Sequence, residues 1–253
     1  MALSPSEVKI AVAAHKPYPM PEGLVYFPLQ VGAANHARFG IAGDDTGENI
    51  SARNANWCEL TGLYWCWKNL AAEGALGLVH YRRHFRGEHG IATDDEIVAS
   101  LNGAPCLLPK PRRYFIETNR SQYDHAHHAI DLDRTREIIA ERSPRHLDAF
   151  DRVMRRTWGH RFNMFAMRRS LFDGYCAWLF DILFELERTL DISGYSPYDA
   201  RVFGFVSERL LDVWIEAERV DYVERAVVNL ESQHWTTKIA RFLARKFLTS
   251  PSA

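Results

Sequence analysis

LGLVHYRRHF, residues 76–85, joins a short apolar run to a dense group of basic side chains. The run from Leu76 to Val79 is typical of a buried strand. Two histidines and two adjacent arginines follow it directly. In open α/β sheets, ligands bind just outside the carboxyl ends of the strands. Because the guanidinium group is a planar fork of donors that matches phosphate oxygens, we interpret this strand end as an anion site for a phosphorylated ligand. The alternative is a surface strand end whose arginines pair with local carboxylates.

The composition is that of an ordinary globular protein. The chain has 253 residues, of which 47% are hydrophobic and 25% charged, and this suits a single α/β domain. A net charge of −1 provides no overall field for nucleic acid. The four cysteines are scattered without a CxxC pair, and neither a signal peptide nor a long apolar segment is present. We therefore expect a cytoplasmic protein that does not bind nucleic acid.

Strands and helices are expected to alternate on either side of this motif. We expect strands at residues 9–14, 106–109, 161–168 and 220–228. We expect helices at residues 57–70, 132–142, 170–190 and 207–218. Alternation first, followed by a mainly helical second half, favours an α/β fold with a mixed central sheet.

Polar residues gather around the start of the helix expected at 57–70. They are Asp44, Asp45, Asn49, Ser51, Asn54 and Glu59. The paired aspartates either bind Mg²⁺ or Mn²⁺ or serve a glycine-containing turn. The amide and hydroxyl groups either hold a ligand at a helix amino terminus or cap that helix. Glu59 lies off the aromatic stripe of the helix and, if buried, needs a partner such as Arg82 or Arg83.

A second polar group contains His125, His127, His128 and Asp131. Its spacing does not match a helical zinc motif. His127 and Asp131 are four residues apart and would share one face if the segment is helical. A carboxylate that orients an imidazole is a known acid–base pair. A capping Asp131 with an exposed histidine is the structural alternative.

Two further segments have both a functional and a structural interpretation. Ser207-Glu208-Arg209 follows the apolar stretch 202–206 and is expected to begin a helix. A glutamate in a first helical turn is favoured by the helix dipole. The functional alternative is that Glu208 acts as a general base. The segment from Trp235 to Leu248 is expected to form a basic amphipathic helix that suits an anionic membrane, and the alternative is a helix that docks on a partner or caps the core. We therefore divide the chain into one domain at residues 1–233 and a tail at 234–253.

Seven segments stand in a fixed order: KIAVAAHKPY, DDTGENIS, NWCELTGLYWCWKN, GLVHYRRHF, FNMFAMRR, WLFDILFELE and RVFGFVSERLLDVWI. From about residue 9 to 223, this series resembles a bacterial family of capsular and exopolysaccharide glycosyltransferases, catalogued as domain of unknown function 4422. The resemblance implies a GT-A-like fold and transfer of a sugar from a nucleotide-linked donor. A UDP-linked galactofuranose is the donor suggested by some relatives. The implied acceptor is a capsular, exopolysaccharide, O-antigen-type or lipid-linked glycan at the inner face of the membrane.

The resemblance also implies roles for individual residues. His15 and Tyr18 would hold the nucleotide base, and Asn49, Ser51, Asn54 and Glu59 would line the donor pocket. Asn163 and Arg209 would bind the acceptor. His80, Tyr81, Arg82 and Arg83 stand where many GT-A enzymes carry a metal-binding DxD motif. No acidic pair is present there, so no metal ligand is assigned and a requirement for Mg²⁺ or Mn²⁺ stays open. Arg82 and Arg83 would neutralise the departing diphosphate instead.

The expected reaction is direct displacement with inversion at the anomeric carbon of a hexosyl donor. Glu208 is the first candidate for the general base, and His127 with Asp131 is the second. Two other classes stay open. One is a nucleotide-processing hydrolase or phosphotransferase that uses His80 or His84. The other is a non-catalytic module that binds nucleotide or glycan.

Overall fold

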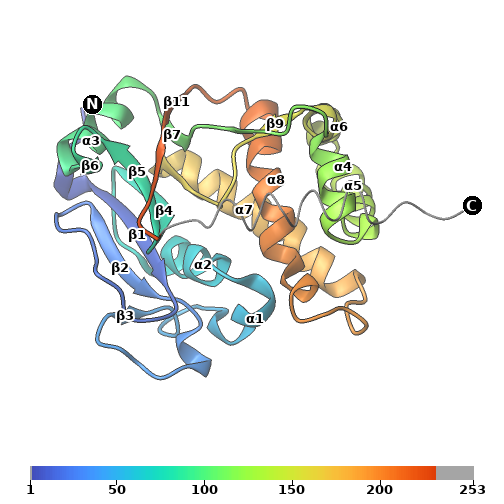
Figure 1. Ribbon diagram of the computed structural model, residues 1–253, viewed down its shortest axis with the longest axis horizontal. Coiled ribbons are helices and arrows are strands. Elements are labelled where there is room, and N and C mark those ends of the chain that lie inside the picture. Colours follow the sequence, from blue (N-terminus) through green and yellow to red (C-terminus); the bar gives the residue numbers. More distant parts are fainter. Residues whose placement is uncertain (1, 232–253) are drawn as a thin grey trace, which may run out of the picture.

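A mixed sheet forms the centre of the protein. The structure is a computed structural model that describes residues 2–231 (Figure 1). Across the sheet the strand order is β11, β7, β10, β4, β1, β2, β3. Their bounds are β1 Val8–Ala14, β2 Tyr26–Gln30, β3 Ala42–Gly43, β4 Ala75–His80, β7 Cys106–Pro109, β10 Phe165–Arg168 and β11 Tyr222–Arg225. The expected mixed α/β fold is confirmed.

Strand direction determines which strand ends meet at one edge. Strand β1 is parallel to both β2 and β4, and β2 is parallel to β3. Strand β10 is antiparallel to β4 and β7, and β11 is parallel to β7. Because β1 and β4 run in the same direction with Ala13 opposite His80, His15 and the basic motif leave the sheet at the same edge.

A branch of short strands extends from β4. The chain turns at Tyr81 and Arg82 into β5 (Arg83–Gly87), so the two arginines lie on a tight hairpin. Strand β5 pairs with β6 (Gly90–Ile91) and with β12 (Val227–Asn229). Strands β8 (Arg112–Arg113) and β9 (Trp158–Gly159) form a separate pair. The last described strand therefore supports the arginine hairpin from one side.

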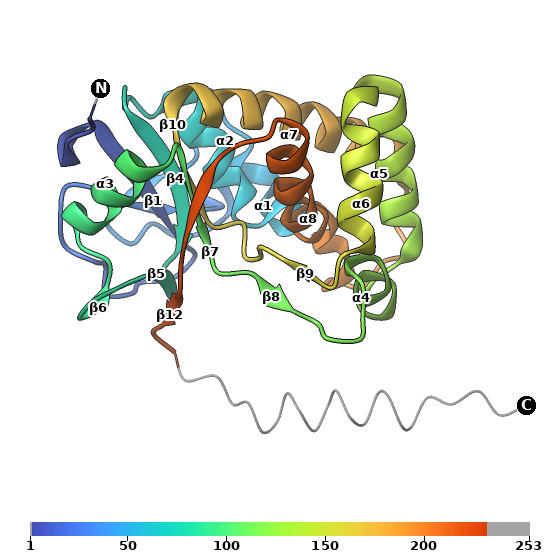
Figure 2. The same cartoon turned by 90° about the horizontal axis from the view of Figure 1, so that it is seen from above.

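Helices cover both faces of the sheet (Figures 1 and 2). Their bounds are α1 Asn54–Trp57, α2 Leu60–Asn69, α3 Asp94–Gly103, α4 Asn119–Ala126, α5 Ala129–Arg142, α6 Leu147–Arg155, α7 Arg169–Thr189 and α8 Val202–Ala217. Successive side chains of a strand point to opposite faces. Ala11 and Ala13 of β1 therefore join the core under α2, α7 and α8, while Ile10 and Val12 join the core under α3.

Several expected elements differ from the structure. The single strand expected at 220–228 is divided into β11 and β12, which pair with β7 and β5. The helix expected at 57–70 is broken at Cys58, whose φ of 52° is left-handed, and neither Ser51 nor Asn54 caps it with a side-chain hydrogen bond. The strand expected at 161–168 begins only at Phe165. Helix α8 begins at Val202, so Glu208 lies in its second turn and not at its start. The apolar run at 202–206 is thus buried helix, which hydrophobicity alone does not distinguish from a strand.

The expected membrane helix from Trp235 to Leu248 and the proposed boundary at residue 233 lie outside the described residues. Within residues 2–231, no helix combines the length and the apolar character needed to cross a bilayer.

Candidate active site

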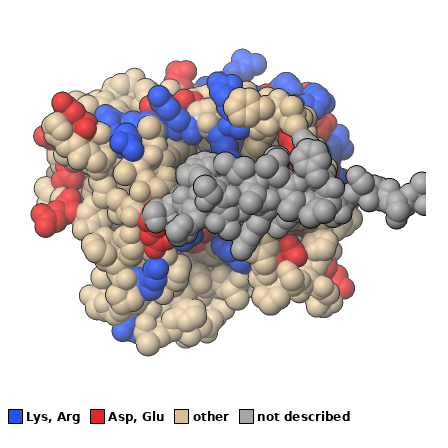
Figure 3. Space-filling view, in the orientation of Figure 1, with Lys and Arg blue, Asp and Glu red and all other residues tan. Residues whose placement is uncertain are grey.

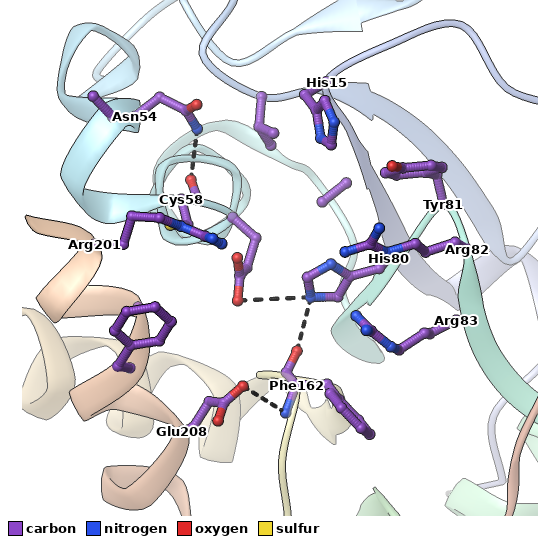
Figure 4. A pocket seen from close by; sticks show the side chains of 16 residues that line it. His15, Asn54, Cys58, His80, Tyr81, Arg82, Arg83, Phe162, Arg201 and Glu208 are labelled. Atoms are coloured by element: carbon purple, nitrogen blue, oxygen red, sulfur yellow. Dashed lines mark hydrogen bonds and ion pairs between the residues drawn. The ribbon is translucent and has the colours of Figure 1, made fainter. Parts of the chain in front are cut away.

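A pocket of about 620 Å³ opens at the carboxyl ends of β1 and β4 (Figure 4). Much of its lining consists of residues that the sequence predicts as donor-binding or catalytic: His15, Asn54, Glu59, His80, Tyr81, Arg82, Arg83 and Glu208. They come from β1, the β4–β5 hairpin, the α1–α2 region and α8. Segments far apart in the sequence therefore meet in one site.

Cationic side chains form the hairpin wall of the pocket. Arg83 is partly buried, and its guanidinium carbon lies 4.5 Å from the centre of the Phe162 ring. Burial and the neighbouring charge of Arg82 lower the pKa of Arg83. The Nε atoms of both arginines are buried and have no hydrogen-bond partner among residues 2–231. A wall of this kind is suited to an anion that supplies the missing acceptors.

Arg82 and Lys16 share a carboxylate at the end of the described chain. Glu231 lies 3.4 Å from Arg82 Nη1 and 3.2 Å from Lys16 Nζ. The backbone N–H of Leu230 donates to the Arg82 carbonyl at 2.9 Å. The nearby aromatic rings of His15 and Tyr18 pack edge-on against Tyr81, with centroid distances of 5.2 Å and 4.8 Å. Tyr18 therefore supports the wall through Tyr81 and is not among the residues that line the pocket.

Glu59 and His80 form a polar pair at the base of this wall. His80 Nε2 donates to the Phe162 carbonyl at 2.8 Å and lies 3.6 Å from Glu59 Oε1. Asn163 Nδ2 donates to the same Glu59 oxygen at 2.6 Å. Burial alone would raise the pKa of Glu59, but the charge of His80 and the two side-chain hydrogen bonds outweigh it and lower the pKa to about 2. The partner of Glu59 is thus His80, and the expected pairing with Arg82 or Arg83 is wrong.

A strained turn connects this pair to Glu208. Phe162 and Asn163 have φ angles of 77° and 51°, and the left-handed region is costly for a phenylalanine. The Phe162 N–H donates to Glu208 Oε1 at 3.1 Å, while its carbonyl accepts from His80. Ser207 Oγ donates to Asn163 Oδ1 at 2.9 Å. The two left-handed residues therefore hold the side chains of His80, Glu59 and Glu208 in fixed relative positions.

Acid titration tests the Glu59 interaction. Because its pKa falls from 4.5 to about 2 on folding, ionised Glu59 stabilises the protein fully well above pH 4.5 and loses this effect as the pH falls towards 2. The quantity to follow is the unfolding free energy of the wild type minus that of Glu59→Gln. We expect this difference to decrease by about 2 kcal/mol when the pH is lowered from about 6 to about 3. Urea unfolding at each pH measures it. Replacing the exposed Glu88 by glutamine is the control, and a difference that stays constant or grows contradicts the interaction.

Two side chains that line the opposite wall, Arg201 and Phe205, were not predicted from the sequence. Arg201 precedes α8, and its Nε donates to Cys58 Sγ at 3.1 Å. Phe205 lies in the first turns of α8 and also lines the pocket. Burial raises the pKa of the Cys58 thiol to about 11. The signal was hidden because the helix was expected to begin only near Ser207, which left the apolar stretch at 202–206 outside it, whereas α8 begins at Val202.

Some predicted site residues are positioned behind the pocket lining. Asn49 closes a local turn, bonding the Gly47 carbonyl and the Ser51 N–H. Asn163 is buried and contacts Glu59 instead of facing open space. Arg209 is also buried, donating to the Phe205 carbonyl at 2.8 Å and to Gln122 at 2.6 Å. Asn163 and Arg209 thus support the pocket lining, and neither side chain is presented to an acceptor as expected.

The paired aspartates have structural partners. Asp44 is buried and accepts hydrogen bonds from the backbone N–H groups of Gly32 and Ala33, both at 3.0 Å, and from the Ser51 hydroxyl. Asp45 pairs with Arg38. Asp44 therefore organises the loops beside β2, and Ser51 belongs to this network and not to the pocket lining. Within residues 2–231, no group of three or more His, Cys, Asp or Glu side chains has an arrangement suited to a metal ion.

His127 and Asp131 do not pair. Helix α4 ends at Ala126 and α5 begins at Ala129, so the two side chains do not share one helix face. Asp131 accepts hydrogen bonds from Tyr123 at 2.8 Å and Tyr195 at 2.6 Å. His127 stacks on Phe205 and lies 3.7 Å from Asp199. Burial and the charge of Arg209 lower the pKa of His127 to about 4, which leaves it neutral near pH 7 and a weak base.

The fold agrees with that of a solved glycosyltransferase. The apo structure of the bifunctional glycosyltransferase WbbM matches this chain with a TM-score of 0.84 and 29% sequence identity. The match covers 89% of this chain and 45% of that one, so the chain spans less than half of its length. The protein therefore has a glycosyltransferase-like fold.

The family follows from the sequence itself. The profile of a family described as a domain of unknown function, DUF4422, matches residues 9–219. The chain belongs to this family, as the seven ordered segments led us to expect. No curated protein matches the chain significantly.

Proposed function

We propose that this chain is a glycosyltransferase that moves a sugar from a UDP-linked donor to a hydroxyl of a bacterial surface glycan. The observation that carries the proposal is the charge arrangement of one pocket, in which Arg82 and Arg83 lie across from Glu208 (Figure 4) and Glu59 also belongs to the lining. The glycosyltransferase-like fold supports it. A volume of about 620 Å³ is within the range of small-molecule sites.

The arginine hairpin would bind the diphosphate. The buried Nε atoms of Arg82 and Arg83 lack acceptors, and diphosphate oxygens would supply them. Two guanidinium groups would also neutralise the charge that develops on the leaving group. His15 and Tyr81, which line the pocket, are the candidate surface for the uracil base, and Tyr18 supports Tyr81 from behind. Arginines in this role leave a divalent metal unnecessary for charge neutralisation.

The chemical step would be a single displacement. An oxygen of the acceptor hydroxyl attacks the anomeric carbon, and the bond from that carbon to the diphosphate oxygen breaks with inversion. The diphosphate leaves with the bonding electron pair, and Glu208 takes the hydroxyl proton. Oε1 of Glu208 is held by the Phe162 N–H. Glu59 is an unsuitable base because its pKa is about 2, and we assign it to positioning His80.

The acceptor and donor sugar are narrower proposals. The resemblance to capsular and exopolysaccharide glycosyltransferases suggests a capsular, exopolysaccharide or O-antigen-type acceptor, and galactofuranose is the proposed sugar. The basic amphipathic sequence from Trp235 to Leu248 supports contact with the inner membrane face, where a lipid-linked acceptor would reside.

A thermal-shift panel of nucleotide sugars, each with and without EDTA, tests the proposal. Near-saturating UDP-galactofuranose is expected to raise Tm by about 5–10 °C, more than donors with other nucleotides, and EDTA is expected to leave the shift unchanged. Turnover is then measured with the best donor, with and without a glycan acceptor. Nucleotide release at the same rate without acceptor would indicate a hydrolase. A Tm that no nucleotide sugar changes would remove the proposal.

A further inference from the structure

Two adjacent apolar side chains project from the loop that connects β7 to α4. Phe115 and Ile116 are 87% and 73% exposed, the highest values for large hydrophobic residues among residues 2–231. They follow β8 directly and precede α4. Single exposed apolar residues are common, but two adjacent large ones at a loop tip indicate a surface that is covered in use.

The base of this loop is rigid although its tip is exposed. The Tyr114 N–H donates to the Thr157 carbonyl at 2.7 Å, and the Tyr114 hydroxyl accepts from Arg161 Nε at 2.8 Å. Phe115 has a φ of 60°, a left-handed conformation that is unfavourable for an aromatic residue. Strain of this kind persists only where the surroundings enforce it. The fold therefore holds the Phe115–Ile116 tip outward at an energetic cost.

Basic side chains accompany the tip. Lys110, Arg112 and Arg113 are exposed, and none has a carboxylate within ion-pair distance in the described part of the chain. The acidic residue next to the tip, Glu117, is occupied by His125 Nδ1 at 2.7 Å. Lys and Arg side chains gather along the upper part of the face seen in Figure 3. The loop thus presents apolar and cationic groups together, and the carboxylate of Glu117 contacts His125 instead of the loop cations.

The loop lies on the side of the protein that carries the arginine hairpin. Strands β8, β5 and β12 follow the same side in Figure 2. Arg161, which fixes Tyr114, also donates to the Glu208 backbone carbonyl at 3.2 Å. A surface that receives the loop tip would therefore be close to the pocket.

We infer that the loop at residues 110–116 is a membrane-contact site that inserts Phe115 and Ile116 into the interface of an anionic bilayer. Lys110, Arg112 and Arg113 would contact the lipid phosphates. Apolar tips beside unpaired cations are the groups that peripheral proteins use at such interfaces. The membrane contact itself is independent of the proposed function. Only its role, which is to bring the pocket to a lipid-linked acceptor, rests on the proposed function. This contact is also separate from the membrane contact proposed for the tail.

Vesicle sedimentation of the full chain, without donor, tests the inference. The vesicles are phosphatidylcholine alone or phosphatidylcholine with phosphatidylglycerol. We expect wild type to bind the anionic vesicles, and F115S/I116S to lower the partition coefficient about tenfold. R112Q/R113Q removes two charges, each worth about fivefold near an anionic surface. The matched control is Leu24→Ser, because Leu24 is 61% exposed but lies beside Asp94 and Asp95.

The outcomes separate this inference from the proposed function. If F115S/I116S binds anionic vesicles as strongly as the wild type does, membrane contact would be assigned to the tail and the inference would be overturned. Failure of the wild type to bind them would overturn it too and redirect attention to a protein partner, as would an equal loss in Leu24→Ser. Thermal unfolding verifies that the variants are folded. If vesicle binding falls as expected but no variant transfers sugar even to a soluble acceptor, the proposed function alone fails.

Discussion

Replacing Arg83 with alanine is expected to lower kcat/KM for the nucleotide sugar by about 10²–10³-fold, with kcat itself reduced. Arg83 makes no ion pair within residues 2–231, and its buried Nε has no acceptor. Arg82, in contrast, shares its charge with Glu231 at 3.4 Å. Arg83 is therefore the hairpin arginine without a carboxylate at ion-pair distance in the described residues, and its charge contributes most when the leaving diphosphate becomes more negative.

Steady-state kinetics with varied donor measures this effect. The matched control is Arg86→Ala, because Arg86 lies three residues further along β5 and is exposed. Arg83→Lys should restore part of the loss, since an ammonium keeps the charge but not the planar fork of donors. Near-normal turnover of both Arg82→Ala and Arg83→Ala, combined with complete inhibition by EDTA, would show that a metal ion performs this task.

The position of the site was predictable because local patterns determine it. An apolar run followed by HYRRHF predicts a strand end with a basic turn, and KIAVAAHKPY predicts another strand end with His15. Parallel strands then bring the two ends to one edge without any information on side-chain contacts. The helix from Arg169 to Thr189 was equally clear, since its apolar spacing extends over many turns.

Partners across the site were not predictable, because they depend on turns with unusual backbone conformations. Cys58 breaks the expected helix with a left-handed φ and so sets the direction of Glu59. Phe162 and Asn163 adopt the same region, although only asparagine among them favours it. The hydrophobic periodicity of the sequence does not predict such turns. Glu59 was therefore assigned to an arginine when its contacts are His80 and Asn163.

The predicted start of helix α8 was also wrong, and this affected the residues assigned to the site. Placing the start of α8 near Ser207 gave Glu208 a helix-dipole role that its second-turn position does not provide. It also concealed Arg201 and Phe205 as pocket residues. Even so, Glu208 reaches the pocket, because residues 204, 205 and 208 follow one face of the helix. The helical spacing was thus more informative than the predicted boundary.

Replacing Glu208 with glutamine is expected to lower kcat by about 10²–10⁴-fold and to leave the donor KM nearly unchanged. Glutamine retains an oxygen for the Phe162 N–H, which donates to Glu208 Oε1 at 3.1 Å. The strained turn and the His80 contact are therefore preserved, and the change removes chiefly the ability to accept a proton. Donor binding, measured by titration without acceptor, verifies that the pocket is intact.

His127→Ala decides between the two candidate bases. His127 lies behind Phe205, and its pKa of about 4 makes it a weak proton acceptor, so we expect this variant to keep kcat within about tenfold of wild type. Loss of turnover in His127→Ala with near-normal turnover in Glu208→Gln would reverse the assignment. The reversal would require a movement of Phe205, because that ring separates the imidazole from the pocket. The static arrangement therefore favours Glu208, which reaches the pocket without any rearrangement.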